Sequence, residues 1–297
     1  MSRRLRHVVT PGQAGLRVDQ VAKEVFHLTA SVLRRVKWLE DGITLDGQKA
    51  FVSDLVAPGQ VLEVLVDQPG RQAKVLSYPG VLDLVYEDDH IVVINKQAGV
   101  LVHPIVPAQV DTIGNFLLWH YNTSGQSGTL FHPVHRLDRG TTGLLVAAKH
   151  PSAQTALKEQ LHTPDFQRRY LALTAGAPEP MAGTVDAPIQ KAPDSPIRHG
   201  VFPDGQRAVT HYETLSLHGP WALVRLTLDT GRTHQIRVHM AHIGHPLLGD
   251  FLYGQESPYI TRPALHSAQL SFLHPMTGRR LDFTQPLPKD MARLLEE

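Results

Sequence analysis

The 297-residue sequence contains no cysteine. A disulfide framework, a thiolate nucleophile and a metal site with cysteine ligands are therefore excluded. No apolar run approaches the roughly 20 residues that a membrane-spanning helix needs, and no hydrophobic stretch follows the basic N-terminus as it would in a secretory signal. We therefore expect a cytoplasmic protein that does not enter a membrane.

A strong excess of either charge is also missing, because the formal net charge is only +1. Residues 1–80 hold 11 Lys and Arg against 8 Asp and Glu, which leaves 18 against 20 for residues 81–297. A mildly basic N-terminal part is compatible with a nucleic-acid partner and equally with ordinary surface charge. No phosphate-binding glycine loop, nucleophile elbow or dinucleotide fingerprint occurs, so NTP hydrolysis, serine-hydrolase chemistry and hydride transfer lack their usual motifs.

Turn residues divide the chain into two unequal parts. Two helical patterns followed by short strands predict a small domain over residues 13–68. Residues 69–80 contain repeated Pro-Gly pairs, which are typical of a linker. Residues 81–297 mix strands and helices without strict alternation, which favours an α+β fold. The helices that we expect in this larger part are residues 112–120, 153–161 and 232–242.

One motif places a carboxylate between two arginines. Asp138 follows His135, Arg136 and Leu137 in a polar loop that leads into an apolar strand. Adjacent positive charge favours an ionised carboxylate, and an ionised carboxylate can act as a nucleophile. An isolated Arg-x-Asp would be interpreted more simply as a structural ion pair.

A second motif, residues 228–250, is rich in histidine and arginine. On the predicted helix, His234 and Arg237 would share one face, which indicates either a polyanion or a metal as the ligand. The motif holds four histidines: His234, His239, His242 and His245. Their spacing does not match known zinc signatures, and no acidic residue lies between them to act as a base. We therefore expect no metal.

The third motif is Arg168-Arg169-Tyr170, a basic pair at the start of a predicted strand. A tyrosine on a basic surface can stack on a nucleic-acid base. More often such a tyrosine is a half-buried strand residue whose hydroxyl is hydrogen-bonded. The residues alone leave both interpretations open.

Together, these segments resemble the RluA-like family of pseudouridine synthases. The family signature H-R-L-D-x-x-T-S-G-L-L occurs as residues 135–145, with Thr142 where serine is usual. Other matching segments appear in the family's order: residues 86–89, 95–96, 99–104, 169–172, 230–239, 244–250, 265–267 and 274–275. Residues 13–68 are similar to the small alpha-L type RNA-binding domain.

The resemblance implies an α+β protein whose catalytic domain, residues 81–297, is built on a mixed, largely antiparallel sheet. It implies an isomerase that turns uridine into pseudouridine in RNA without a cofactor or metal. Asp138 would be the nucleophile and Arg237 would orient it through a salt bridge. Tyr170 would stack on the target base and assist proton removal, and Arg136 would fill the gap left by the flipped uridine. We expect three further side chains to contact the substrate: His135, Arg232 and His234.

Relatives with this N-terminal domain act mostly on large-subunit ribosomal RNA. We therefore expect structured RNA as the partner, with ribosomal RNA first and transfer RNA second, and a monomeric protein. Two alternatives stay open. The chain could be a catalytically inactive RNA-binding or ribosome-assembly factor on the same fold, or a histidine-metal hydrolase.

Overall fold

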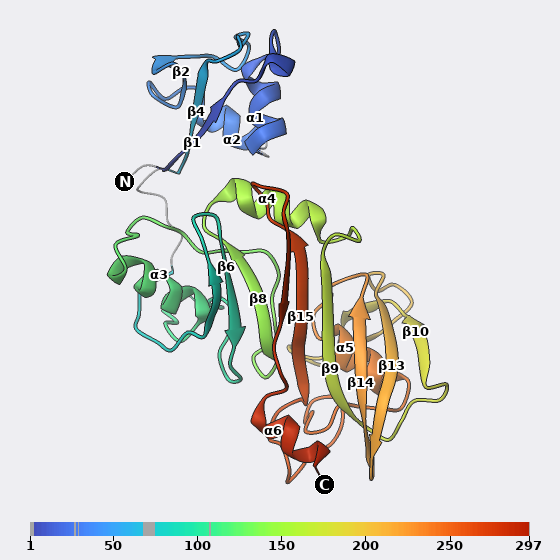
Figure 1. Cartoon of the computed structure of the whole chain (residues 1–297). Helices are drawn as coiled ribbons and strands as arrows, with labels where there is room; N and C mark the ends of the chain where they lie inside the picture. Colours follow the sequence, from blue (N-terminus) through green and yellow to red (C-terminus); the bar gives the residue numbers. More distant parts are fainter. Residues whose placement is uncertain (1–2, 27, 29, 68–74, 107, 297) are drawn as a thin grey trace.

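The computed structural model of the chain describes residues 3–26, 28, 30–67, 75–106 and 108–296. Two of the three β-sheets in these residues organise the fold (Figure 1). A four-stranded sheet belongs to the N-terminal part, and a larger sheet carries most of the remaining chain. The N-terminus lies beside the small sheet, and the C-terminus lies at the opposite end of the large one.

The small sheet and two helices enclose an apolar core of their own. The sheet order is β1 (Arg3–Val8), β4 (Val61–Asp67), β2 (Ile43–Leu45) and β3 (Gln48–Lys49), with α1 (Val18–Phe26) and α2 (Ala30–Val36) packed on it. Asp46 and Gly47, which have φ angles of 49° and 78°, form the hairpin turn between β2 and β3. Strand β1 pairs with β4 along its whole length. The sheet therefore begins before residue 13, where the sequence had placed the start of the domain.

The predicted linker, residues 69–80, lies partly outside the described residues. Its described end, from residue 75, packs on the large domain: Val75 contacts the main core, and the Tyr78 amide donates to the Asn115 carbonyl at 3.2 Å. Residues 75–80 therefore belong structurally to the large domain.

The large sheet has the order β10-β13-β14-β9-β15-β8-β6-β5, with β16 paired to β15 and β7 to β8. Its strands are β5 (Leu84–Glu87), β6 (Ile91–Lys96), β7 (His132–Pro133), β8 (Thr142–Ala148), β9 (Gln167–Ala175), β10 (Ala182–Asp186), β13 (Val209–His218), β14 (Trp221–Leu228), β15 (Leu265–Leu273) and β16 (Arg280–Thr284). Only the pairing of β8 with β15 is parallel among the described strands. The predicted α+β fold with a mixed, largely antiparallel sheet is confirmed.

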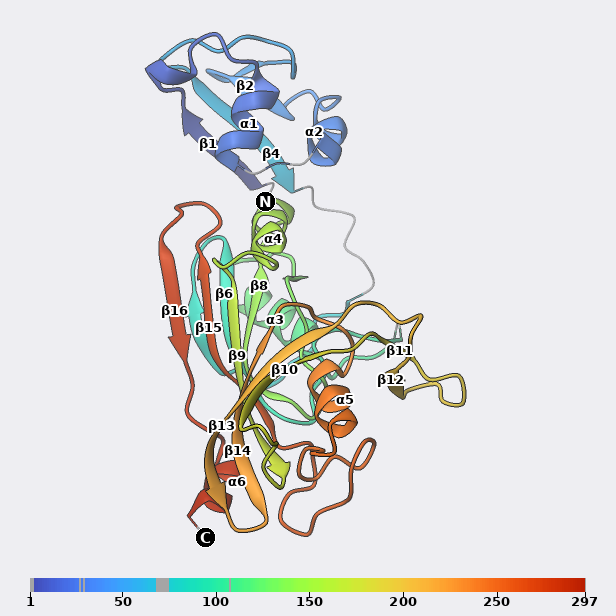
Figure 2. The same ribbon diagram turned by 90° about the vertical axis from the view of Figure 1, so that its right-hand side faces the viewer.

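Helices cover both faces of the large sheet. They are α3 (Ile113–Thr123), α4 (Pro151–Gln160), α5 (Gln235–His242) and α6 (Lys289–Ala292), followed by the 3-10 helix η2 (Arg293–Leu295). Alternate residues of β6 face opposite ways: Val92 and Ile94 pack with α3 and α5, whereas Ile91 and Val93 pack with α4 and β16. The helices α3 and α5 lie on the same side of the sheet, and β16 lies on the other (Figure 2).

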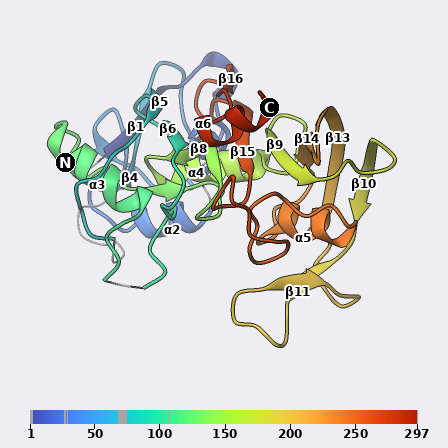
Figure 3. The ribbon, with the colours of Figure 1, turned by 90° about the horizontal axis from the view of Figure 1, so that it is seen from below.

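A two-stranded ribbon of β11 (Ile189–Lys191) and β12 (His199–Val201) projects beyond α5, as the view from below shows (Figure 3).

Across the part of the chain that the structure describes, no helix has the length and apolar character to cross a bilayer.

Candidate active site

A cavity of about 390 Å³ opens where the loop before β8, the first residues of β9 and the start of α5 meet. All seven residues predicted to bind or transform a substrate line it: His135, Arg136, Asp138, Tyr170, Arg232, His234 and Arg237. Five lining residues are arginine or lysine, and Asp138 is the only carboxylate among the described lining residues. The wall of this cavity therefore attracts an anionic ligand.

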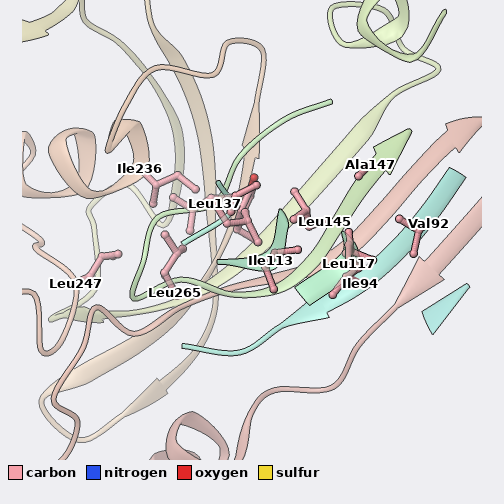
Figure 4. Close-up of a cluster of buried hydrophobic side chains, with 14 of the residues drawn as sticks. Val92, Ile94, Ile113, Leu117, Leu137, Leu145, Ala147, Ile236, Leu247 and Leu265 are labelled. Carbon is pink, nitrogen blue, oxygen red and sulfur yellow. The ribbon is translucent and has the colours of Figure 1, made fainter. Parts of the chain in front are cut away.

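Apolar neighbours in the chain fix the two central polar residues. Leu137 precedes Asp138 and Ile236 precedes Arg237, and both side chains are buried in the main core, where they approach Leu265 (Figure 4). Because each core residue locks the backbone beside it, Asp138 and Arg237 are held on facing walls of the cavity.

The loop that carries Asp138 is also held from behind. The buried ammonium group of Lys96 donates to the Arg139 carbonyl at 3.2 Å, and Arg262 donates to the Gly140 carbonyl at 3.0 Å. Gly143, where the loop enters β8, has a φ of 104°, and a Cβ there would lie 2.3 Å from the Ser267 carbonyl oxygen. Only glycine fits that position. Burial lowers the pKa of Lys96 to about 7, an effect that the charge of Arg262 adds to and that of Asp138 opposes.

Arg237 lies between two carboxylates and binds them unequally. Its Nη1 atom is 3.7 Å from Asp138, whereas Nε and Nη2 donate to Asp250 at 2.7 and 2.8 Å. Asp250 is fully buried and also accepts from the Leu252 amide at 3.1 Å. The resemblance implied a salt bridge of Arg237 with Asp138 alone, and Asp250, at the end of the second motif, was not predicted. Its position at the end of that polar segment was the available signal.

The chain is similar to known proteins in sequence. Residues 90–242 match the family described as RNA pseudouridylate synthase. The uncharacterised RNA pseudouridine synthase YjbO of Bacillus subtilis is 41% identical over 269 residues, 91% of this chain and 95% of that protein. The chain belongs to the RNA pseudouridylate synthase family. The predicted family and the enzyme class, an isomerase, are thereby confirmed.

Two further relatives of the synthase extend the comparison. The protein named ribosomal large subunit pseudouridine synthase D of Pseudomonas aeruginosa is 39% identical over 299 residues, 95% of this chain and 91% of its own. The structure of human RNA pseudouridylate synthase domain containing 4 superposes with a TM-score of 0.60 at 27% identity, covering 72% of this chain and 92% of the human one.

Helix α5 of the synthase begins three residues later than predicted, at Gln235 rather than at residue 232. His234 is left-handed, with a φ of 57°, so it does not share a helical face with Arg237 as the sequence suggested. The buried Gln235 side chain explains the late start, because its amide donates to the Val209 carbonyl at 2.9 Å and its oxygen accepts from the Arg232 amide at 2.9 Å. The loop before α5 is therefore tied to β13.

Three polar groups in the cavity of the synthase are held neutral. Burial lowers the pKa of His135 to about 3, and nearby Arg168 adds to this. Burial also lowers the pKa of His234, whose Nδ1 atom accepts from the Tyr253 hydroxyl at 2.8 Å. The pKa of Tyr170 is raised by burial above 10. These three side chains therefore add no charge to the cavity at neutral pH.

Three histidines of the second motif, at positions 234, 239 and 245, have hydrogen-bond partners within the protein. Both ring nitrogens of His239 are hydrogen-bonded, Nδ1 to Thr210 at 2.8 Å and Nε2 to the Ala187 carbonyl at 2.9 Å. His245 Nδ1 lies 3.0 Å from the Ala175 carbonyl oxygen and donates to it. Within the described ranges, no group of three or more His, Asp or Glu residues is placed to hold a metal ion. The sequence does not suggest these bonds, because Thr210 and Ala187 are remote in the chain.

Proposed function

We propose that this synthase converts uridine to pseudouridine in large-subunit ribosomal RNA, with Asp138 as the nucleophile. The position of Asp138 carries the proposal: it is the only described carboxylate in a cavity that five arginine and lysine residues help to line, and its side chain is 19% exposed. Relatives named as ribosomal large subunit pseudouridine synthases, 37–39% identical, support the choice of RNA.

The reaction breaks the N1–C1′ bond of uridine and joins C5 to C1′, while C5 loses a proton and N1 gains one. Nothing is consumed, so the proposal includes no cofactor and no metal. The carboxylate of Asp138 would supply the electron pair for covalent catalysis, and Arg237, 3.7 Å away, would orient it. We further propose that the protein acts in the cytoplasm as a monomer.

The remaining cavity residues would hold the substrate. The Tyr170 ring would stack on the target base. Because its raised pKa keeps the phenol protonated, stacking suits it better than proton removal does. A uridine must leave its helix to expose the glycosidic bond, and the exposed Arg136 side chain would fill the space that it leaves. His135, Arg232 and His234 would contact the nucleotide at the wall.

Asp138→Asn tests the proposal. The variant keeps the shape of the side chain and loses the nucleophilic oxygen, so pseudouridine formation should fall by at least about 10⁴-fold while RNA binding persists. Asp282→Asn is the matched control, because the Asp282 side chain is 66% exposed on β16, outside the cavity. Pseudouridines are mapped across ribosomal and transfer RNA from cells lacking the gene and from cells that carry each variant.

The outcomes separate the alternatives. A uridine that requires the gene and Asp138 supports the proposal. If the gene-dependent pseudouridines occurred only in transfer RNA, transfer RNA would be the substrate instead. Growth or assembly effects without any gene-dependent pseudouridine would favour a catalytically inactive RNA-binding factor, and activity of purified protein that chelators remove would favour a metal hydrolase.

A further inference from the structure

Arg168 is a buried cation that has no counterion among the residues that the structure describes. The residue is 7% exposed, and its Nε atom is buried with no hydrogen-bond acceptor. Its side chain makes no hydrogen bond and no ion pair with any residue that the structure describes. A buried charge is costly unless it is paired. The other buried arginines of this region differ: Arg237 is paired with Asp250, and Arg262 with Asp290.

The protein contacts that Arg168 does make are weak or uncharged. Its guanidinium lies 5.9 Å from the centre of the Phe166 ring, at the outer limit of a cation–π contact. It also lies against Gly231, since a Cβ placed there would be 3.5 Å from Nη1. His135, its cavity neighbour, is neutral and adds no charge. The positive charge of Arg168 is therefore left for a ligand.

The position of Arg168 indicates which part of a nucleotide it meets. Arg168 and Tyr170 are two residues apart on β9, so both side chains point into the same cavity. Two exposed side chains, Lys158 and His162, also line the cavity. With the base stacked on Tyr170, as in the proposed function, the sugar and its phosphate would extend toward Arg168.

We propose that Arg168 binds a backbone phosphate adjoining the flipped uridine and so fixes the nucleotide relative to Asp138. The inference rests on the proposed function, because it assumes that the cavity receives a uridine. A phosphate supplies the negative charge that the protein does not, and guanidinium groups bind phosphate through two parallel hydrogen bonds. The contact is made as the nucleotide enters the cavity.

The test combines protein variants with neutralised phosphates. A synthetic RNA segment that contains the uridine modified by the wild type is made with native linkages, or with one methylphosphonate on the 5′ or the 3′ side of that uridine. Single-turnover kinetics on the full chain give the concentration for half-maximal rate and the maximal rate. Arg168→Gln removes the charge, and Arg168→Lys keeps it. Arg169→Gln is the control: Arg169 is exposed on the opposite face of β9 and contacts Gln269 at 3.1 Å.

For the wild type, one of the two neutral linkages should raise the half-maximal concentration about tenfold, which corresponds to about 1.4 kcal/mol. Arg168→Gln should show the same loss on native RNA and no further loss on the neutral linkage, because both changes remove one contact. Arg168→Lys should recover most of the affinity, and Arg169→Gln should behave as the wild type. This pattern would not arise from a merely structural role of Arg168.

The proposal is overturned if neither neutral linkage changes the half-maximal concentration of the wild type by more than about twofold. This measurement uses only the wild-type protein, so it does not depend on whether any variant folds. It is also overturned if Arg168→Gln stays sensitive to both linkages and loses only maximal rate, which would indicate a contact to the base. Either result leaves the proposed function standing, because the wild type still forms pseudouridine. Absence of pseudouridine with the wild type would contradict the proposed function itself.

Discussion

Arg237 is shared between two carboxylates of different character. Asp250 is fully buried and takes the two short hydrogen bonds, whereas Asp138 is partly exposed at 3.7 Å. The stronger pair fixes the guanidinium, and its remaining nitrogen then faces Asp138. Asp250 therefore acts as a positioning residue, and Asp138 stays available to a ligand in the cavity.

Asp250→Asn should lower the free energy of unfolding by about 3 kcal/mol, because it leaves a buried guanidinium without its main counterion. Turnover should fall as well, since Arg237 loses its fixed position. Asp138→Asn should change stability by less than about 1 kcal/mol, because its partner remains paired. Urea denaturation of both variants measures the difference. Equal stability losses would contradict the unequal sharing.

His135 should make the protein less stable in mild acid. Burial lowers its pKa to about 3, against about 6.5 in an unfolded chain. The unfolded state therefore binds one more proton between these values, and stability is lost as the pH falls below 6.5. From pH 7 to pH 5 the loss from this residue is about 2 kcal/mol. In His135→Gln the decrease in unfolding free energy should be smaller by that amount, measured by urea denaturation at both pH values. The same substitution at the exposed His242 is the control. If His135→Gln kept the pH dependence of the wild type, His135 would be excluded as the source.

Among the elements, the loop between β7 and β8 is held by two distant segments, residues 96–99 and the segment before β15. Lys96 at the end of β6 and Arg262 before β15 bind its carbonyls, and Gly99 exchanges hydrogen bonds with Arg139. Arg262 is in turn held by Asp290 of α6, at 2.7 and 2.8 Å. The C-terminal helix is therefore connected to the loop that carries Asp138 through a single side chain.

Asp290→Ala should loosen this connection. Arg262 would lose both carboxylate hydrogen bonds, which should cost about 2 kcal/mol of stability, and turnover should fall by up to about 100-fold as Asp138 becomes less well positioned. The affinity for RNA should change little, because Asp290 is outside the substrate cavity. Lys289→Ala, an exposed change on the same helix, is the control for both measurements. Reduced affinity with unchanged turnover would show that α6 acts on binding instead.

In the whole molecule, the small domain has an apolar core that is separate from those of the large domain. The small domain buries Val18, Val21, Leu62 and Val64 completely within its own sheet and helices. The large domain contributes Met276 to the edge of that core. The separate core makes independent folding of the large domain reasonable, and we propose that the small domain increases affinity for RNA.

Deletion of residues 1–68 should leave a folded large domain with weaker RNA binding. The deletion removes β1 together with its partner β4, so no strand is left unpaired. Each lost phosphate contact should reduce the slope of log affinity against log salt by about 0.7–0.9, while turnover at saturating RNA is less affected. Circular dichroism and salt-dependent binding of both forms measure this. An unchanged slope, or aggregation through an exposed Met276 surface, would favour a structural role for the small domain.

Local sequence patterns were sufficient to predict several elements and site residues of this protein. The continuous apolar run of residues 91–94 is typical of a buried strand, and Asp46-Gly47 is typical of a hairpin turn, because strand burial and turn conformation depend on neighbouring residues. The grouping of Asp138, Tyr170 and Arg237 was implied by the resemblance to the RluA-like family, and the structure places all three around one cavity. The sequence also held the signal for Arg168, in a basic pair whose two members point to opposite faces of β9.

Only the tertiary structure decided how these charges are paired. Contacts between segments that are far apart in the chain connect the cavity to Asp250, Lys96 and Arg262. Burial sets the free-energy cost of leaving each of these charges unpaired. The left-handed His234 and the late start of α5 follow from hydrogen bonds of Gln235 to β13, which no helical periodicity reveals. Sequence motifs thus identify which residues meet at the site. The packing of β9, β13 and α5 determines that Arg237 is paired with Asp250 and that Arg168 is left for a ligand. Such pairing depends on distances between side chains in three dimensions, which the order of residues in the chain does not give.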